Sequence, residues 1–509
     1  MALGEGSHGS ILNGNYAATW VTSAWKSTGD VLIDGDSITA VGYAGTATAD
    51  TVIDGEGKLV MPGLINSHMH SPEALYKGRY SNMPLEVWML YAYPILGAQT
   101  LTPRMVYLRT ALCAIESLKT GSTCVTDDVY ESPNQTPEQL DAVFQAYEDV
   151  GLRATISGHL VDRPFLDTIP FIRDLVPRDL CAQADALPPA DGTAWLAHCR
   201  DALAQHHGRA GRLNFMVVPS APQRCTPEVM QAAMELAQTH DVPFHTHILE
   251  TRVQAVTGQE FYGETLIAYM HRLGLLQRQT TIAHSIWVTD HDIELMGEAG
   301  VSIVHNVISN QKLGAGVAPV KRMLRAGINV ALGSDGVSTS DTTRMFAVMH
   351  AAGLIHNVQT PDMELWLSAQ EVLHAATLGG ARSACLDGVT GSLEVGKKAD
   401  MLVLDLNTIP FTPLNDMANH LVYCENGSSI THAIVNGEVM AEDGKCLRVN
   451  EAELLAELRD AMPAFKEAHE KTEALNHQFD PYFRKIHERC AGIDVGVLRM
   501  GHEPAWGRP

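Results

Sequence analysis

The stretch Pro62-Gly63-Leu64-Ile65-Asn66-Ser67-His68-Met69-His70 follows the apolar run Leu59-Val60-Met61 and ends in two histidines one residue apart. An apolar run of this length predicts a buried β-strand over residues 59–67. In an extended strand residues i and i+2 point to the same side, so His68 and His70 can reach one metal ion without backbone distortion. The stretch therefore predicts a strand that delivers two metal ligands.

Three further polar motifs stand where strand-like runs stop: His245-Thr246-His247-Ile248-Leu249-Glu250, Ala283-His284-Ser285 and Gly333-Ser334-Asp335-Gly336. With 23 histidines in 509 residues, a His-x-His pair is expected roughly once by chance, so one such pair has little specificity. A single histidine on an apolar strand is more often a hydrogen-bonded core residue than a ligand. The combination of residue types, strand-end placement and chain order favours a mononuclear metal hydrolase instead.

The composition is that of a globular enzyme with more than one domain. A chain of 509 residues is too long for one core and predicts a large domain with a smaller one. Lysine and arginine number 36 against 59 aspartates and glutamates, which gives a net charge of −23. This balance argues against a nucleic-acid partner, because phosphate binding needs clustered basic side chains.

The cysteines and the chain start bear on the cellular compartment. Nine cysteines are scattered along the chain without a CxxC pair, which argues against a disulfide framework or a structural zinc site and fits a reducing cytoplasm. The first residues lack a basic segment followed by an apolar one. The sequence contains no run of about 18 apolar residues, so we expect no membrane span. We expect a cytoplasmic protein without a membrane partner.

Two β-rich segments flank a long middle region. Residues 30–42 read as a hairpin, and residues 430–440 read as another with Asn436-Gly437 as its turn. Residues 391–400 precede a further strand-like run at 401–404. We expect a small β-sandwich domain built from both chain ends, residues 1–60 and 388–450.

The middle region, residues 61–387, alternates strand-like and helix-like segments. Amphipathic helices are expected at 227–239 and 290–299. Strands are expected at 59–67, 122–127, 153–157, 213–218, 242–247, 280–283, 301–305 and 328–333. Eight such units in about 320 residues match an α/β fold, a (β/α)8 TIM-like barrel. Residues 451–509 are expected to form a helical C-terminal extension, which starts with a helix at 452–468 and packs outside the barrel or at a subunit contact.

Active sites of such barrels gather at the carboxyl ends of the strands. His68 and His70 fall at the end of the first strand, and His247, His284 and Asp335 at the ends of the fifth, sixth and eighth. These positions converge although they are far apart in the sequence. Three imidazoles and one carboxylate suit Zn²⁺ or Fe²⁺ and leave a position for a water, whose pKa the metal lowers.

The same set supplies acid and base groups. Asp335 can both touch the metal and accept the proton of the water. Glu250 lies three residues beyond His247, where it can donate a proton to the substrate, and His284 can orient the water or stabilise a developing oxyanion.

The motifs around His68, His247, His284 and Asp335, taken together, resemble those of the amidohydrolase superfamily. A further segment resembles the branch that contains S-adenosylhomocysteine deaminase, guanine deaminase and the triazine hydrolases. This segment, residues 305–320, reads His305-Asn306-Val307-Ile308-Ser309-Asn310-Gln311-Lys312-Leu313-Gly314-Ala315-Gly316-Val317-Ala318-Pro319-Val320. The resemblance covers about residues 25–445. It implies that four residues bind the metal: His68, His70, His247 and Asp335. It also implies that Glu250 protonates a ring nitrogen of a cyclic amidine and that His284 polarises the attacking water.

The resemblance also bears on metal number. Binuclear relatives use a carboxylated lysine at the end of strand four, where this chain reads Val217-Val218-Pro219-Ser220-Ala221-Pro222-Gln223. We therefore expect one divalent metal ion, Zn or Fe(II). Departures from the deaminase pattern are Ser220, where a histidine is common, and Thr339-Ser340-Asp341, where a Ser-Asn-Asn-like sequence is common. These departures, and an extension beyond about residue 450 that is longer than expected, leave the substrate open.

Several polar and aromatic residues near the motifs are candidates for substrate binding: Glu73, Tyr76, Trp88, Tyr93, Gln223, Arg224, His305 and Asn310. Ordinary loop packing is the alternative for each of them. Trp88 is the best candidate for stacking on a flat heterocycle. His245 shares a strand face with His247, and we interpret it as a support for the ligands or as inner barrel packing.

The expected function is hydrolytic removal of an amino or substituted-amino group from a small-molecule nitrogen heterocycle by metal-activated water. One alternative is that the same site hydrolyses a C–Cl, C–S, amide or urea bond, as triazine hydrolases do. An alternative of another class is a non-enzymatic scaffold, which is disfavoured because none of the expected ligands is missing. Since relatives are frequently oligomeric, we also expect a homo-oligomer.

Overall fold

A break at Gly63 separates two sheets of the computed structural model, which describes residues 9–14, 29–42, 49–132, 134–187 and 189–500. Strand β5 (Lys58–Pro62) pairs antiparallel with β15 (Met401–Asp405), whereas β6 (Leu64–His70) starts the barrel. A Cβ atom at Gly63 would lie 1.9 Å from Thr123 Oγ1 of the next barrel strand, so only glycine fits at this crossing. The single strand expected at 59–67 is therefore two strands in different sheets.

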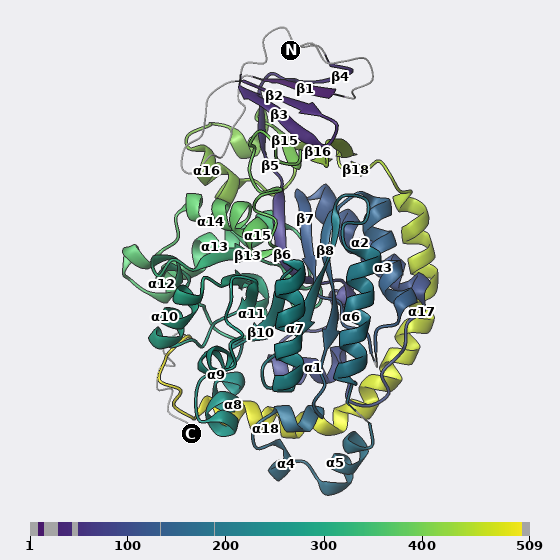
Figure 1. Ribbon diagram of the computed structural model, residues 1–509, viewed down its shortest axis with the longest axis vertical. Helices are drawn as coiled ribbons and strands as arrows, with labels where there is room; N and C mark the ends of the chain where they lie inside the picture. The colour runs from purple at the N-terminus through teal and green to yellow at the C-terminus, as the bar shows by residue number, and fades with distance from the viewer. Residues whose placement is uncertain (1–8, 15–28, 43–48, 133, 188, 501–509) are drawn as a thin grey trace.

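The barrel strands form one parallel sheet in chain order, which curls round so that its last strands lie against β6; Figure 1 shows this sheet from the side. After β13 the chain continues into β14 (Asp335–Gly336), which pairs parallel with β6 and places Asp335 opposite Met69. The other strands are β7 (Ser122–Asp127), β8 (Arg153–Leu160), β9 (Leu213–Pro219), β10 (Phe244–Ile248), β11 (Thr280–His284), β12 (Ser302–His305) and β13 (Asn329–Leu332). The expected (β/α)8 barrel is confirmed.

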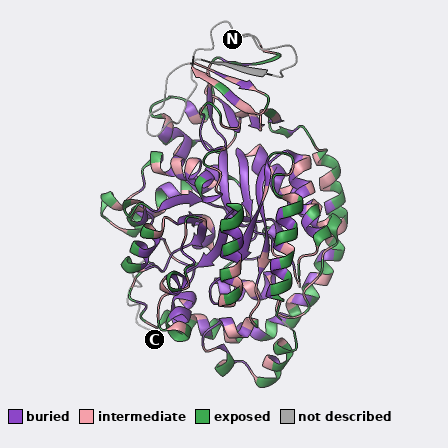
Figure 2. Cartoon of the chain, viewed as in Figure 1, coloured by how far each residue is buried: buried purple, intermediate pink, exposed green. Residues whose placement is uncertain are grey.

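Helices surround the barrel sheet, whose strands are buried at the centre while the helices expose their outer faces (Figure 2). Helix α7 (Pro227–His240) begins with a proline at its first turn, and α10 (Asp290–Ala299) begins with a capping box between Thr289 and Asp292. Both lie where the sequence predicts them. The other helices of the barrel region are α1 (Leu85–Ala92), α2 (Pro103–Lys119), α3 (Pro137–Val150), α4 (Ile172–Leu175), α5 (Arg178–Asp185), α6 (Gly192–His206), α8 (Arg252–Tyr262), α9 (Leu266–Arg272), α11 (Val307–Lys312), α12 (Val320–Arg325), α13 (Met345–Gln359), α14 (Ala369–Ala375) and α15 (Leu378–Ser383).

A small sandwich is built from both chain ends, as expected from the sequence. One sheet has the order β3-β2-β1-β4 and the other β18-β17-β16-β15-β5. Their strands are β1 (Gly9–Gly14), β2 (Asp30–Asp34), β3 (Ser37–Gly42), β4 (Thr51–Gly55), β16 (Ile430–Val435), β17 (Glu438–Glu442) and β18 (Lys445–Cys446), and the short helix α16 (Met417–Asn419) precedes β16. The sheets share an apolar core of Val31, Ile33, Ile38, Ile53, Val60, Leu393, Ala399, Met401, Val403 and Ile434. The turn between β16 and β17 has Asn436 and Gly437 with positive φ, as the hairpin predicts.

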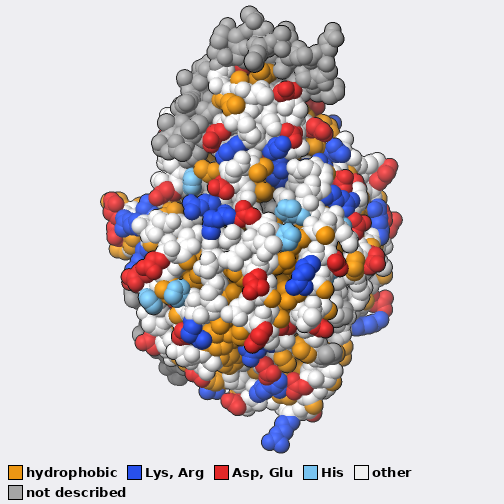
Figure 3. Space-filling model, viewed as in Figure 1, with side chains coloured by type: hydrophobic (Ala, Val, Ile, Leu, Met, Phe, Trp, Pro, Cys, Tyr) orange, Lys and Arg blue, Asp and Glu red, His pale blue; other side chains and the backbone are white. Residues whose placement is uncertain are grey.

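The C-terminal extension wraps around the outside of the barrel (Figure 1). Helix α17 (Glu451–Asn476) packs against α2 and α1, and α18 (Asp480–Ala491) packs against α1, α4 and α8. The helix expected at 452–468 is thus longer than predicted. None of the described helices is long and apolar enough to cross a membrane. Acidic and basic side chains are interspersed over the face drawn in Figure 3.

A buried ion pair joins the barrel to the sandwich. Arg153, the first residue of β8, donates from Nε and Nη2 to the two carboxylate oxygens of Asp400, at 2.6 and 3.1 Å. Both side chains are buried. Asp400 also accepts from the backbone N–H of Asn436, whose side-chain oxygen takes another hydrogen bond from Arg153. The bidentate geometry gives both carboxylate oxygens of Asp400 a partner.

Asp400→Asn should destabilise the fold strongly, because it leaves the Arg153 guanidinium buried without a counter-charge. We expect the free energy of unfolding in urea to fall by about 3–5 kcal/mol. The matched control is Glu467→Gln, which removes an exposed pair with Lys471 and should change stability by less than about 0.5 kcal/mol. A D400N protein as stable as the wild type would contradict this role of the pair.

Candidate metal centre and active site

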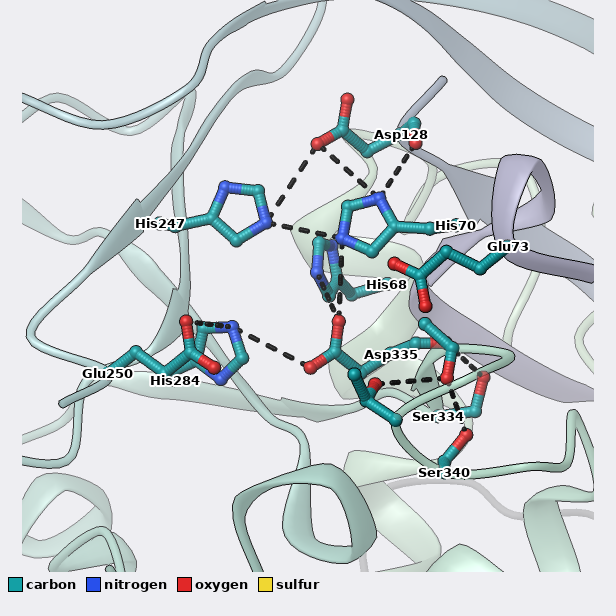
Figure 4. Close-up of polar contacts among 12 residues, drawn as sticks. His68, His70, Glu73, Asp128, His247, Glu250, His284, Ser334, Asp335 and Ser340 are labelled. Atoms are coloured by element: carbon teal, nitrogen blue, oxygen red, sulfur yellow. Dashed lines mark hydrogen bonds and ion pairs between the residues drawn. The ribbon is translucent and has the colours of Figure 1, made fainter. Parts of the chain in front are cut away.

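Three histidines turn their Nε2 atoms toward one point at the carboxyl ends of the barrel strands (Figure 4). His70 Nδ1 donates to the backbone oxygen of Asp128 at 2.8 Å, and His247 Nδ1 donates to that of Ser220 at 2.9 Å. A carbonyl can only accept, so each Nδ1 carries the proton and each Nε2 keeps its lone pair. The two Nε2 atoms are 3.4 Å apart.

His68 completes the set of imidazoles. Its Nδ1 lies 2.8 Å from Nε2 of His245, a contact that is consistent with the interpretation of His245 as a support for His68. His68 Nε2 is buried and forms no well-aligned hydrogen bond among the described residues, although Asp335 Oδ1 lies 3.2 Å away. Buried polar atoms usually have a hydrogen-bond partner, and an imidazole nitrogen without one, beside two other imidazole nitrogens and a carboxylate, is what a divalent metal site requires. The residues present therefore fit a metal ion.

Asp335 adds a carboxylate to this point. Its Oδ1 lies 3.2 Å from His68 Nε2 and 3.4 Å from His70 Nε2. Asp335 has a φ of 65° and His284 one of 75°, a left-handed conformation that costs energy for non-glycine residues and is found mainly at functional sites. The chain turns sharply at the ends of β11 and β13 and so aims both side chains into the centre.

Burial shapes the protonation of this centre. It lowers the pKa of His68 to about 4 and that of His247 well below its ordinary value, which keeps both imidazoles neutral, as metal ligands must be. Burial acts in the same sense on His70, but the nearby carboxylates of Asp335, Asp128 and Glu73 raise its pKa above the ordinary value. A metal that binds there would displace a proton from His70.

A row of titratable groups, Glu250–His284–Asp335, borders the centre. Nε2 of His284 lies 3.6 Å from Glu250 Oε2 and 3.8 Å from Asp335 Oδ2. Its Nδ1 donates to Asn310 Oδ1 at 2.9 Å, so Nε2 is the acceptor that faces the two carboxyl groups. Burial, aided by the charge of Asp335, raises the pKa of Glu250 to about 7, although His284 and Arg224 oppose this shift. A carboxyl group with such a pKa can give up a proton near neutral pH.

The row opens into a cavity of about 1010 Å³. Four of the eight expected substrate-binding residues line it, namely Glu73, Trp88, Tyr93 and Arg224, beside His70, His247, Glu250, His284 and Asp335. Glu73 accepts from Tyr93 Oη at 2.7 Å and from Ser338 Oγ at 2.8 Å. The ring of Trp88 packs edge-on against Tyr93, with its Nε1 hydrogen-bonded to Ser338 Oγ. One wall of the cavity is therefore a connected aromatic and acidic surface.

The structure places the other four expected residues elsewhere. Tyr76 turns toward Phe465 and His469 of α17. The side chain of Asn310 is engaged by His284. The ring of His305 is buried against His356, and Gln223 is buried too. None of the four is among the residues that line the cavity, so substrate contact stays a prediction for them. They lie one layer behind the cavity surface, a difference that spacing along the chain does not reveal.

Two residues that the sequence analysis did not single out belong to this site. Asp128 follows β7 directly, and its Oδ2 lies 3.8 Å from His70 Nδ1 and 3.9 Å from His247 Nε2. It also pairs with His159 Nδ1 at 2.9 Å, and His159 lines the cavity. An acidic residue immediately after the expected strand 122–127 was the available signal for Asp128.

Known proteins share this architecture. A model of the amidohydrolase family matches residues 59–440. The 5'-deoxyadenosine deaminase of Methanosarcina barkeri is 32% identical over 435 residues, 85% of this chain and 92% of that protein. The 5-methylthioadenosine/S-adenosylhomocysteine deaminase of Caldanaerobacter subterraneus subsp. tengcongensis is 34% identical over 418 residues, 81% of this chain and 88% of that protein.

Solved structures agree with the sequence comparisons. An adenosine deaminase from Xanthomonas campestris with bound zinc has a TM-score of 0.78 at 26% identity and covers 89% of this chain and 98% of its own. The atrazine chlorohydrolase from Arthrobacter aurescens, complexed with zinc, has a TM-score of 0.81 at 25% identity and covers 89% and 100%. The family model spans the whole barrel, and two relatives are 32 and 34% identical over most of this chain. This hydrolase therefore belongs to the amidohydrolase family.

Proposed function

We propose that this protein is a metal-dependent deaminase that replaces an exocyclic amino group of a purine nucleoside of the adenosine type with a carbonyl oxygen. The observation that carries the proposal is the row Glu250–His284–Asp335 at the floor of the cavity. Hydrolysis of a cyclic amidine needs one group that takes a proton from water and another that gives a proton to the ring nitrogen. A carboxyl group with a pKa of about 7, beside an imidazole whose acceptor nitrogen is fixed, meets both needs.

The metal ligands in this proposal are His68, His70, His247 and Asp335. A divalent ion held there would lower the pKa of a bound water towards neutrality. We favour zinc over iron, because two proteins of similar fold were solved with zinc. The expected numbers remain one ion per chain and four protein ligands.

The chain's own residues would carry the protons. His284 Nε2 accepts the proton of the attacking water, and Asp335 Oδ2, 3.8 Å away, stabilises the imidazolium that results. Glu250 donates its proton to the ring nitrogen of the substrate, which neutralises the charge that builds up there. His284 then returns the proton of the water to the amino group, which leaves as ammonia, and Glu250 regains a proton from the new hydroxyl as it becomes the carbonyl. Trp88 stacks on the flat base, and Arg224 supplies hydrogen-bond donors beside Glu250.

The adenosine-type substrate rests on two features. Curated relatives are named for deamination of 5'-deoxyadenosine, 5-methylthioadenosine and S-adenosylhomocysteine, and a cavity of about 1010 Å³ has room for a base with a large substituent. A second candidate is hydrolysis of a C–Cl bond on a triazine, which the likeness to atrazine chlorohydrolase favours. The homo-oligomeric state, the cytoplasmic location and the domain limits given above stay predictions.

A substrate screen tests the proposal. The purified protein should release ammonia in equal amount to the substrate consumed from at least one of adenosine, 5'-deoxyadenosine, 5-methylthioadenosine and S-adenosylhomocysteine. The ultraviolet spectrum should change from that of an aminopurine to that of an oxopurine. Release of chloride from atrazine, without ammonia from any nucleoside, would replace the proposal by the second candidate.

His68→Ala should remove both metal and activity. One of the four proposed ligands is lost, while the apolar core of the barrel, which does not include His68, and the Arg153–Asp400 pair are kept, so cooperative thermal unfolding should persist. Elemental analysis should find about one metal ion per wild-type chain and much less in the variant. His240→Ala, at an exposed position on α7, is the matched control and should keep both. An H68A protein with full metal content would exclude His68 as a ligand.

Glu250→Gln should separate proton donation from binding. The amide keeps the shape and hydrogen bonds of the side chain but cannot give up a proton, so kcat should fall by about 10²–10⁴-fold while metal content is unchanged. Glu260→Gln, at an exposed position of α8, should leave kcat unaltered. Near-normal kcat in E250Q would mean that the leaving group needs no protonation, as with chloride.

A further inference from the structure

The segment after α1 forms one wall of the cavity although it has no regular structure of its own. Tyr93, Pro94, Ile95, Gly97 and Ala98 all line the cavity, together with Leu85, Trp88 and Met89 of α1. Residues 93–100 form neither helix nor strand. A wall without internal backbone hydrogen bonds needs other partners to keep one shape.

Those partners come from the C-terminal extension. Asn476, the last residue of α17, accepts from the backbone N–H of Leu96 at 3.0 Å and donates to the backbone carbonyl of Leu96 at 2.8 Å. The Asn476 side chain is fully buried. Its amide thus pairs with one peptide unit as a neighbouring strand would.

The next residue of the wall is held in the same way. Thr472 Oγ1, one turn before Asn476, donates to the Gly97 carbonyl at 2.8 Å. Gly97 has a φ of 71°, and a Cβ atom there would lie 2.9 Å from Leu475 Cδ1. Within the described part of the chain, the backbone hydrogen bonds of Leu96 and Gly97 all go to the extension.

The extension also supports other parts of this wall. Tyr91 Oη of α1 donates to Asp480 Oδ2 at 2.8 Å. Phe165, which also lines the cavity, stacks on Phe483 of α18 with ring centroids 6.2 Å apart and planes 9° apart. The metal centre itself is held by barrel strands and by Asp128 and Ser220. Contacts of the extension therefore reach the cavity wall, and the residues proposed for proton transfer lie on other elements.

We propose that the C-terminal extension determines substrate specificity, with Asn476 as the positioning residue that fixes the Leu96–Gly97 backbone against the bound substrate. The proposal rests on the proposed deaminase function for the identity of the substrate. Because Asn476 acts through the wall and not on the reacting atoms, its loss should weaken substrate binding while the chemical step proceeds at nearly its normal rate. A chain that ended before α17 would lack this wall in its present form.

The test compares Asn476→Ala with Asn476→Asp, which keeps an acceptor for the Leu96 N–H but loses the donor to the Leu96 carbonyl. The control is Glu467→Ala, at an exposed position of the same helix. Amide hydrogen exchange of residues 93–98, followed by mass spectrometry in the full-length metal-loaded protein, needs no substrate. N476A should speed this exchange on the order of tenfold, since both hydrogen bonds to Leu96 are lost; N476D should lie between, and E467A should match the wild type.

Steady-state kinetics then use the best substrate from the nucleoside screen. For N476A, KM should rise on the order of tenfold with kcat within about threefold of the wild type. Unchanged exchange at 93–98 would overturn the proposal, as would faster exchange with unchanged KM or a loss confined to kcat. If the wild type turns over no nucleoside, the proposed function fails, while the exchange experiment still decides whether Asn476 holds the wall.

Discussion

Two backbone carbonyls decide which nitrogens of His70 and His247 face the centre of this site. By accepting from Nδ1, the oxygens of Asp128 and Ser220 leave both Nε2 lone pairs directed at the same point. The carbonyls themselves are fixed by the ends of β7 and β9, and so by closure of the barrel. The same barrel places Asp335 opposite Met69 of β6, so that its carboxylate faces these nitrogens at one side and the row through His284 to Glu250 at the other.

Burial is the second condition for the chemistry. The same closed environment keeps the imidazoles of His68 and His247 neutral and brings the pKa of Glu250 to about 7. In water an ordinary glutamate would be ionised at neutral pH and could not serve as an acid. The barrel therefore supplies both a place where ligands converge and a low dielectric in which their proton affinities differ.

Much of this was accessible from the sequence, because it depends on periodicity and strand ends. Strand 122–127 and helix 290–299 were predicted with the bounds that the structure shows, and the convergence of His68, His247 and Asp335 follows from the parallel barrel. The break at Gly63 was missed because an apolar run does not reveal a change of sheet. Contacts between residues distant in the sequence were also missed, such as Asp128 with His70 and Asn310 with His284. They depend on where each loop lies in the folded structure, which spacing along the chain does not show.

The C-terminal extension was also only partly predictable from the sequence. Its helical start was predicted, but not its partners, since hydrogen bonds between Asn476 and Leu96 join residues 380 positions apart. Composition could say only that the segment is helical and charged. The fold gives it a place behind the cavity wall, where the family's metal chemistry is unaffected and the shape presented to a substrate is set.

The central claim is that three imidazole nitrogens and the Asp335 carboxylate converge on one metal ion. X-ray absorption at the metal edge of the purified protein tests it most directly. We predict a first shell of three nitrogen ligands at about 2.0–2.1 Å and one or two oxygens at about 2.0–2.2 Å, with no second metal in the outer shells. A sulfur shell at about 2.3 Å, or a metal–metal distance of about 3.5–4 Å, would contradict the account.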